Sequence, residues 1–148
     1  MEKKKTYVLM LSQVFPKTHN KAGMPTEFKE KVLNKKKIHT IRANYPLWER
    51  RIKEVQEGRA VLAVRQWTGK PYCSKQVEIA RLTTEDGVGI QLLELTNDLS
   101  ECIVGDHRYS YVSVAKNDGL HPADWLDWFS CYDLSKPMAI INFTQFRY

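Results

Sequence analysis

No stretch of this sequence is apolar for long enough to cross a membrane, and its first residues lack the apolar core of a signal peptide. Cysteine is scarce as well. The three cysteines are odd in number and widely spaced, which excludes a disulfide framework and favours free thiols in a reducing compartment. Repeats, linkers and low-complexity tracts are also missing, so we expect residues 1–148 to form a single domain. These absences predict a cytoplasmic protein without a membrane partner.

Metal-ligand spacing is absent too. The four histidines and three cysteines are scattered, whereas structural zinc sites need pairs of ligands a few residues apart. A cysteine nucleophile would need a histidine that only the fold brings near it. We therefore expect no metal and no cofactor.

Positive charge is present in excess. The 148 residues have a formal net charge of +6, with 43% hydrophobic and 27% charged residues. These proportions are ordinary for a globular domain with a core. The basic surplus favours a polyanionic partner, because neutralised phosphates release counterions. In the alternative interpretation, the lysines at 3–5 solubilise a flexible basic N-terminus over residues 1–5, and those at 35–37 end a helix.

The pattern of apolar residues predicts an α+β fold. Strands are expected at residues 6–15, 37–42, 60–67, 75–82, 88–96 and 137–148. Helices are expected at residues 27–36, from Pro46 to Gly58 and from Pro122, with inner faces Phe28, Val32 and Leu33 in the first and Trp48, Ile52 and Val55 in the second. Residues 97–117 are expected to be an insertion, in which 109–114 could add a strand. The simplest architecture is a small mixed β-barrel of about five or six strands, with about three helices at its rim.

The most informative polar cluster lies in residues 37–42 (KIHTIR). Lys37 supplies a point charge, Thr40 a donor and an acceptor, and Arg42 a planar fork that suits phosphate or carboxylate. On a strand, Thr40 and Arg42 share one face while His39 and Ile41 share the other, so a polar face would be backed by a packing face. A purely structural interpretation remains open, because basic residues suit a helix end and threonine suits strands.

The order of these elements resembles the ASCH domain of the PUA-like superfamily. Lys37, Thr40, Ile41 and Arg42 carry the resemblance, supported by residues 118–120 (DGL) ahead of the helix at Pro122. The likeness extends over most of the chain from residue 26 onward. It implies a small β-barrel with a cleft at its mouth, in a superfamily whose members often bind RNA or modified bases.

The resemblance also implies a possible reaction. Some small ASCH proteins are amidohydrolases that remove the acetyl group from N4-acetylcytidine with a lysine, a threonine and a glutamate. Carried over, these catalytic positions are Lys37, Thr40 and Asp118, although an aspartate is one methylene shorter than the family's glutamate. A lysine lowered in pKa could take a proton from Thr40 or water, while Arg42 or backbone N–H groups hold the oxyanion.

A binding function would use the same strand together with the segment that joins the predicted strands at 60–67 and 75–82. Arg42, Arg65 and Lys70 would meet phosphates or base edges, and Trp67 and Tyr72 would offer flat faces for stacking. Alternatively, Trp67 simply ends a core strand and Tyr72 packs against it.

The sequence therefore leads to three alternative predictions of function. Binding of RNA or a modified nucleoside in a basic cleft, through Lys37, Thr40 and Arg42, is the first prediction, because it needs only charge and shape. The second is an amidohydrolase acting on N4-acetylcytidine-type nucleosides. The third is a protein-interaction module with a vestigial cleft. Neither the preferred base nor the oligomeric state follows from the sequence.

Overall fold

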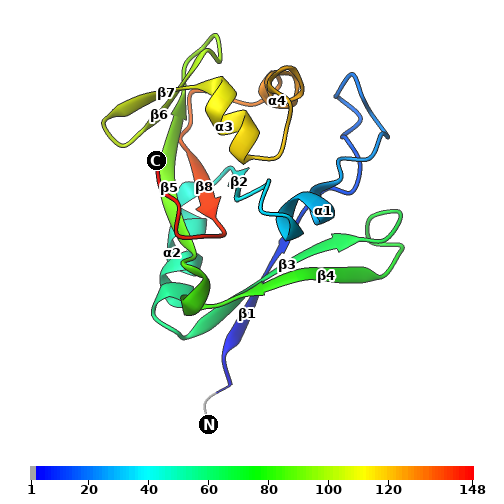
Figure 1. Ribbon diagram of the computed structural model, residues 1–148, viewed down its shortest axis with the longest axis vertical. Helices are drawn as coiled ribbons and strands as arrows, with labels where there is room; N and C mark the ends of the chain where they lie inside the picture. Colours follow the sequence, from blue (N-terminus) through cyan, green and yellow to red (C-terminus); the bar gives the residue numbers. More distant parts are fainter. Residues whose placement is uncertain (1–2) are drawn as a thin grey trace.

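The computed structural model describes residues 3–148, which form two β-sheets and four α-helices (Figure 1). The strands are β1 (Lys5–Met10), β2 (His39–Arg42), β3 (Ala60–Trp67), β4 (Gln76–Leu82), β5 (Gly89–Leu95), β6 (Glu101–Val104), β7 (His107–Ser110) and β8 (Met138–Asn142). The helices are α1 (Phe28–Leu33), α2 (Tyr45–Gln56), α3 (Tyr111–Asn117) and α4 (Pro122–Phe129), with a 3-10 turn at Thr84–Asp86.

The two sheets have separate hydrogen-bond ladders. The smaller sheet has the order β1-β3-β4, with β1 parallel and β4 antiparallel to β3. The larger sheet has the order β2-β8-β5-β6-β7 and is antiparallel throughout. Helix α2 packs against β3 of one sheet and against β5 and β8 of the other. Side-chain packing therefore joins the two sheets.

The α+β class predicted from the sequence is confirmed, but the barrel is not. Within residues 3–148 no ladder joins an edge of one sheet to an edge of the other, so the sheets do not close. The strands number eight instead of five or six, because the predicted insertion contains β6 and β7. The same segment supplies α3, which raises the number of α-helices to four.

The core between the sheets follows the apolar pattern of the sequence. The first five residues of β3 and all five residues of β8 are buried, as expected for strands that are covered on both faces. Helix α2 buries Trp48, Ile52 and Val55, which confirms its predicted inner face. Asn44 caps the N-terminus of α2, because its side chain accepts a hydrogen bond from the Leu47 N–H at 3.3 Å.

Two predicted elements are wrong in extent or type. Helix α1 ends at Leu33, which is 57% exposed and not part of the inner face. Residues 109–114 do not form a strand, since β7 ends at Ser110 and α3 begins at the next residue. Ser110 caps α3 by accepting a hydrogen bond from the Val112 N–H at 3.2 Å. The helix then buries Val114 and Ala115, a one-sided burial that a short β-branched run did not reveal.

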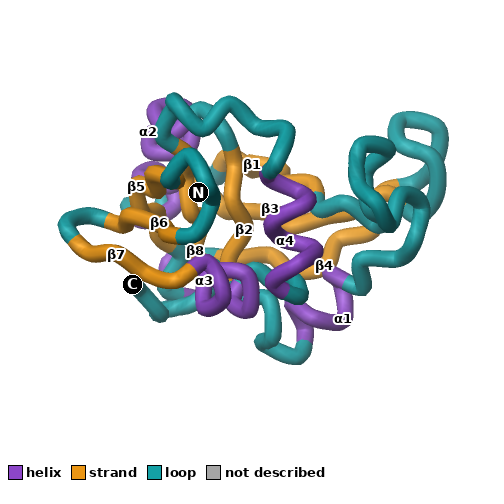
Figure 2. The backbone as a smooth tube through the Cα atoms, turned by 90° about the horizontal axis from the view of Figure 1, so that it is seen from above, coloured by secondary structure: helices purple, strands orange, loops and turns teal. Residues whose placement is uncertain are grey.

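The N-terminal part of the chain also departs from expectation. Lys5, predicted to be flexible, already pairs with Ala60 in the smaller sheet, and residues 1–2 of the expected flexible segment lie outside the described residues. Strand β1 ends at Met10, and residues 11–27 form a long loop in place of further strand. This loop and the β3–β4 turn lie at the same end of the molecule (Figures 1 and 2).

The long loop is fixed against α4. His19 Nε2 donates to the carbonyl oxygen of Asp124 at 2.9 Å, and His19 Nδ1 accepts from the Lys21 N–H at 3.0 Å. The rings of Phe15 and Trp128 meet edge to face with their centroids 5.7 Å apart. Loop and helix together therefore form one wall beside β2, where the polar cluster lies.

Candidate functional site

The structure brings Lys37 and Asp118 into direct contact although they are 81 residues apart. Their backbones form an isolated antiparallel bridge just ahead of β2, and the Ile38 N–H donates to the Asn117 carbonyl at 2.9 Å. Lys37 Nζ donates to Asp118 Oδ1 and to the Asp118 carbonyl oxygen, both at 2.8 Å. The two side chains are 2% and 5% exposed. This is a buried ion pair with two hydrogen bonds.

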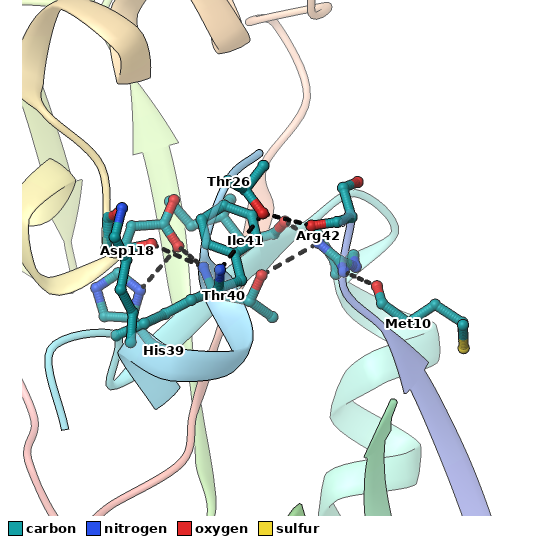
Figure 3. Close-up of polar contacts among 12 residues, drawn as sticks. Met10, Thr26, His39, Thr40, Ile41, Arg42 and Asp118 are labelled. Atoms are coloured by element: carbon teal, nitrogen blue, oxygen red, sulfur yellow. Dashed lines mark hydrogen bonds and ion pairs between the residues drawn. The ribbon is translucent and has the colours of Figure 1, made fainter. Parts of the chain in front are cut away.

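His39 is a member of the site that sequence reasoning placed on the packing face. Its Nδ1 lies 3.6 Å from Asp118 Oδ1 (Figure 3), and its Nε2 lies 2.6 Å from Tyr148 Oη. Asn117 Nδ2 donates to the same Tyr148 hydroxyl at 3.0 Å. Alternation along the strand correctly placed the side chains of His39 and Thr40 on opposite faces. It gave no indication that Asp118 lies close to His39.

Thr40 and Arg42 lie on one face of β2, as predicted. Arg42 Nη1 donates to Thr40 Oγ1 and to the Ile41 carbonyl oxygen, each at 3.1 Å. Arg42 Nη2 donates to the Met10 carbonyl oxygen at the end of β1. The guanidinium is thus fixed by two chain segments beside the threonine hydroxyl (Figure 3). Within residues 3–148 no hydrogen bond joins Thr40 to Lys37 or Asp118.

Lys37, Thr40, Arg42 and Asp118 line one hollow. Apart from Ser12, its other walls are apolar and aromatic, and include Phe28 of α1 together with Trp128 and Phe129 of α4. Lys37 Nζ lies 4.2 Å from the centroid of the Phe28 ring, a cation–π contact. The space open to a water molecule is about 20 Å³, which is room for about one water. A larger ligand must displace the aromatic wall.

A wider apolar groove of about 410 Å³ adjoins this hollow through Leu11 and Ser12. We call it the aromatic groove, because Trp67 at the end of β3 and Tyr72 in the β3–β4 turn line it. Their ring centroids are 5.2 Å apart, and Tyr72 is 89% exposed. Tyr72 has a φ of +65°, a strained backbone conformation for an aromatic residue that often marks functional positions.

The other two predicted binding residues lie outside both cavities. Arg65 forms an ion pair with Glu78 across the hairpin at 3.2 Å and a hydrogen bond with Gln76 at 3.3 Å. Lys70 is exposed in the β3–β4 turn. The structure thus brings Lys37, Thr40, Arg42 and Asp118 together, puts Trp67 and Tyr72 on an adjoining surface, and leaves Arg65 engaged with the acid opposite it.

Burial sets the protonation of the hollow. Desolvation lowers the pKa of Lys37 below its ordinary value, although Asp118 opposes this shift. Desolvation also lowers the pKa of His39, so its imidazole is neutral at neutral pH. For Asp118 desolvation acts in the opposite sense, but Lys37 and His39 outweigh it and hold the pKa below the ordinary value. The site combines an ionised acid with a lysine that loses its proton more easily than usual.

In residues 3–148, no group of three histidine, cysteine or acidic side chains could hold a metal ion. No helix there has the length and apolar character needed to span a membrane. Cys73, Cys102 and Cys131 are free thiols, as the number and spacing of the cysteines predicted.

Comparison with known proteins gives no further identification. No protein-family model, curated protein or solved structure matches this chain.

Gly119 keeps the two halves of the site close. Its φ is +79°, and a Cβ at this position would lie 2.9 Å from Lys37 Cβ. We expect Gly119→Ala to lower the free energy of unfolding by more than Gly105→Ala does, as measured in urea. Gly105 is a matched control, since its φ is +63° but nothing lies within 4 Å of an added Cβ. It should suffer only the left-handed backbone penalty of about 1–2 kcal/mol. Equal losses would contradict the close packing at Lys37.

Asp118 should make stability depend on acid pH. Its pKa is lower in the folded protein than in the unfolded chain. Its contribution is therefore full above the ordinary aspartate value of about 3.9 and is lost as the pH falls through the folded value. Urea unfolding at a series of pH values should show the wild type losing more free energy of unfolding over this range than Asp118→Asn. Parallel curves for the two proteins would rule out this role.

Proposed function

We propose that this protein is an ASCH-like domain that binds a nucleobase of RNA, or of a modified nucleoside, in the hollow beneath Trp128. The observation that carries the proposal is the convergence of Lys37, Thr40, Arg42 and Asp118 on one hollow from segments far apart in the chain. The basic net charge of +6 supports a phosphate-bearing partner.

The hollow has the chemistry to read the edge of a base. Lys37 and Arg42 are donors only, an ionised Asp118 is an acceptor only, and the Thr40 hydroxyl is both. These groups are largely removed from water, so a ligand that lacks a matching donor or acceptor would leave one of them unpaired. Phe28 and Trp128 in the walls add flat faces for stacking. Such a site favours specificity for one base or modification.

Entry of a base requires the wall to open. The water-accessible space of about 20 Å³ is far below the size of ordinary ligand pockets. The wall consists of the long loop and α4, which contact each other through His19 and Trp128. A closed resting state lowers the apparent affinity by the fraction of molecules that are open. The adjoining aromatic groove can hold a neighbouring base on Trp67 and Tyr72 without any opening.

Thermal unfolding with modified nucleosides and short RNAs tests this proposal, because a ligand of the folded state raises the melting temperature. We expect at least one member of the panel to do so. Thr40→Val keeps the shape of the side chain but removes its hydroxyl, and it should lower the affinity for that ligand about tenfold. Tyr72→Ala should weaken the binding of an oligonucleotide by about 1–3 kcal/mol. Val112→Ala, at an exposed apolar residue of α3 that lines neither cavity, should not change it.

If no member of the panel raises the melting temperature, the binding proposal fails. The third possibility, a protein-interaction module with a vestigial cleft, would then explain the chain better. If ligands bind but Thr40→Val has no effect, the binding site is not this hollow.

An amidohydrolase acting on N4-acylated cytidines is the second candidate, favoured by one specific observation. Asp118, although shorter than a glutamate, reaches Lys37 Nζ at 2.8 Å because the backbones of the two residues pair directly. A neutral Lys37 would take a proton from water, whose oxygen then attacks the acyl carbon. The carbon–nitrogen bond breaks and the proton passes from Lys37 to the leaving amine, which gives the cytidine amine and a carboxylic acid. The acid then releases its own proton to solvent and becomes a carboxylate. Arg42 and Thr40 would stabilise the oxyanion.

Release of acetate from N4-acetylcytidine measures this activity directly. We expect turnover by the wild type, none above background with Lys37→Ala, and unchanged turnover with Lys53→Ala, a lysine on the exposed side of α2. Circular dichroism checks that both variants are folded. Binding of N4-acetylcytidine without acetate release would leave the binding function alone.

A further inference from the structure

A third cavity lies beside the turn that carries Asp118 and is lined by Gly119 and Leu120 of that turn. It has a volume of about 410 Å³ between the end of α1 and the end of α3. Four lysines and an apolar floor line it, and we call it the lysine groove: Lys31, Lys35, Lys36 and Lys116 above Ile38 and Leu120. None of the functions considered above uses this groove.

The lysine groove carries charge of one sign. Within residues 3–148 no acidic side chain lines it, and none of its four lysines takes part in an ion pair. Three of them are exposed, and Lys31 Nζ donates only to the Gly119 carbonyl oxygen, at 2.8 Å. Arg59, by contrast, pairs with Glu57 at 2.8 Å. A lysine cluster without acids is an attractive site for an anion.

The shape of the groove suits a phosphate chain. An apolar floor allows lysine stems to lie along it while their ammonium groups stay at the rim. Such ammonium groups contact phosphates as point charges without fixed geometry. Lys35 has a φ of +60° in the turn where the chain reverses after α1. Several phosphates in a row would neutralise these lysines better than one compact anion does.

The groove and the hollow are neighbours. Leu120 lines both cavities, and Lys31 holds Gly119, the residue after Asp118. We propose that the lysine groove binds the sugar–phosphate backbone of a single-stranded nucleic acid whose base occupies the hollow. This inference rests on the proposed function and deepens it, because it assigns a polynucleotide as the ligand instead of a free nucleoside. The groove supplies affinity, while the hollow selects the base.

The salt dependence of RNA binding tests this inference. The probe is a fluorescent single-stranded RNA of about 10 nucleotides, titrated at several salt concentrations. The slope of log K against log salt is negative, and each lost phosphate contact reduces its magnitude by about 0.7. A triple variant, Lys35→Gln, Lys36→Gln and Lys116→Gln, should therefore have a slope that is less steep by about 2, and should bind more weakly at low salt.

A matched triple variant controls for net charge. Lys4→Gln, Lys53→Gln and Lys136→Gln remove the same charge at exposed positions that do not line the groove, and this variant should keep the wild-type slope. Equal changes in both triple variants would overturn the inference. Melting temperatures check that both are folded. Competition by inorganic tripolyphosphate as strong as that by the RNA would also overturn it, since the site would then hold a free polyphosphate.

Failure of the inference and failure of the proposed function give different results. A nucleoside that raises the melting temperature, together with a flat salt response for the RNA, overturns the lysine groove and leaves the hollow as a nucleoside site. RNA binding that depends on the lysine groove but not on Thr40 keeps the groove and overturns the hollow.

Discussion

The buried ion pair between Lys37 and Asp118 is the constraint on which this structure depends. Two charges removed from water are tolerated only when they meet with good geometry and further hydrogen bonds, and here Lys37 Nζ makes two bonds of 2.8 Å. The pair joins the start of β2 to the end of α3 through a backbone bridge. A Cβ at position 119 would lie 2.9 Å from Lys37 Cβ. Because Gly119 has none, the chain can continue from this bridge into α4, which completes the wall of the hollow.

Such a pair is weak support for stability, since replacing a buried ion pair by hydrocarbon is often neutral or stabilising. Two buried polar atoms near the pair also add little to stability. His39 Nδ1 and Asn142 Oδ1 are buried without a hydrogen-bond partner within residues 3–148, although native proteins satisfy nearly all such atoms. Local rules of folding are usually broken where a protein does chemistry or binds a ligand. A polar interior beneath an aromatic wall is therefore better explained by function than by packing.

Three kinds of surface adjoin one another in this region. The hollow presents charged and hydrogen-bonding groups, the aromatic groove presents the rings of Trp67 and Tyr72, and the lysine groove presents lysines without acidic partners. Single-stranded nucleic acids offer a partner for each, namely base edges, base faces and phosphates. The hollow adjoins both grooves through shared lining residues. The proposed polynucleotide would contact all three surfaces.

The sequence by itself determined the features that depend on local periodicity. The α+β class, the inner face of α2 and the shared face of Thr40 and Arg42 followed from which positions along a helix or strand are apolar. Only the tertiary structure decided that Asp118 lies against Lys37, that His39 faces the same acid and that the sheets stay open. Periodicity tells which side of an element is buried, but not against which distant segment. That choice belongs to the packing of the whole chain, in which contacts across 81 residues form only after the cost of closing the loop between them.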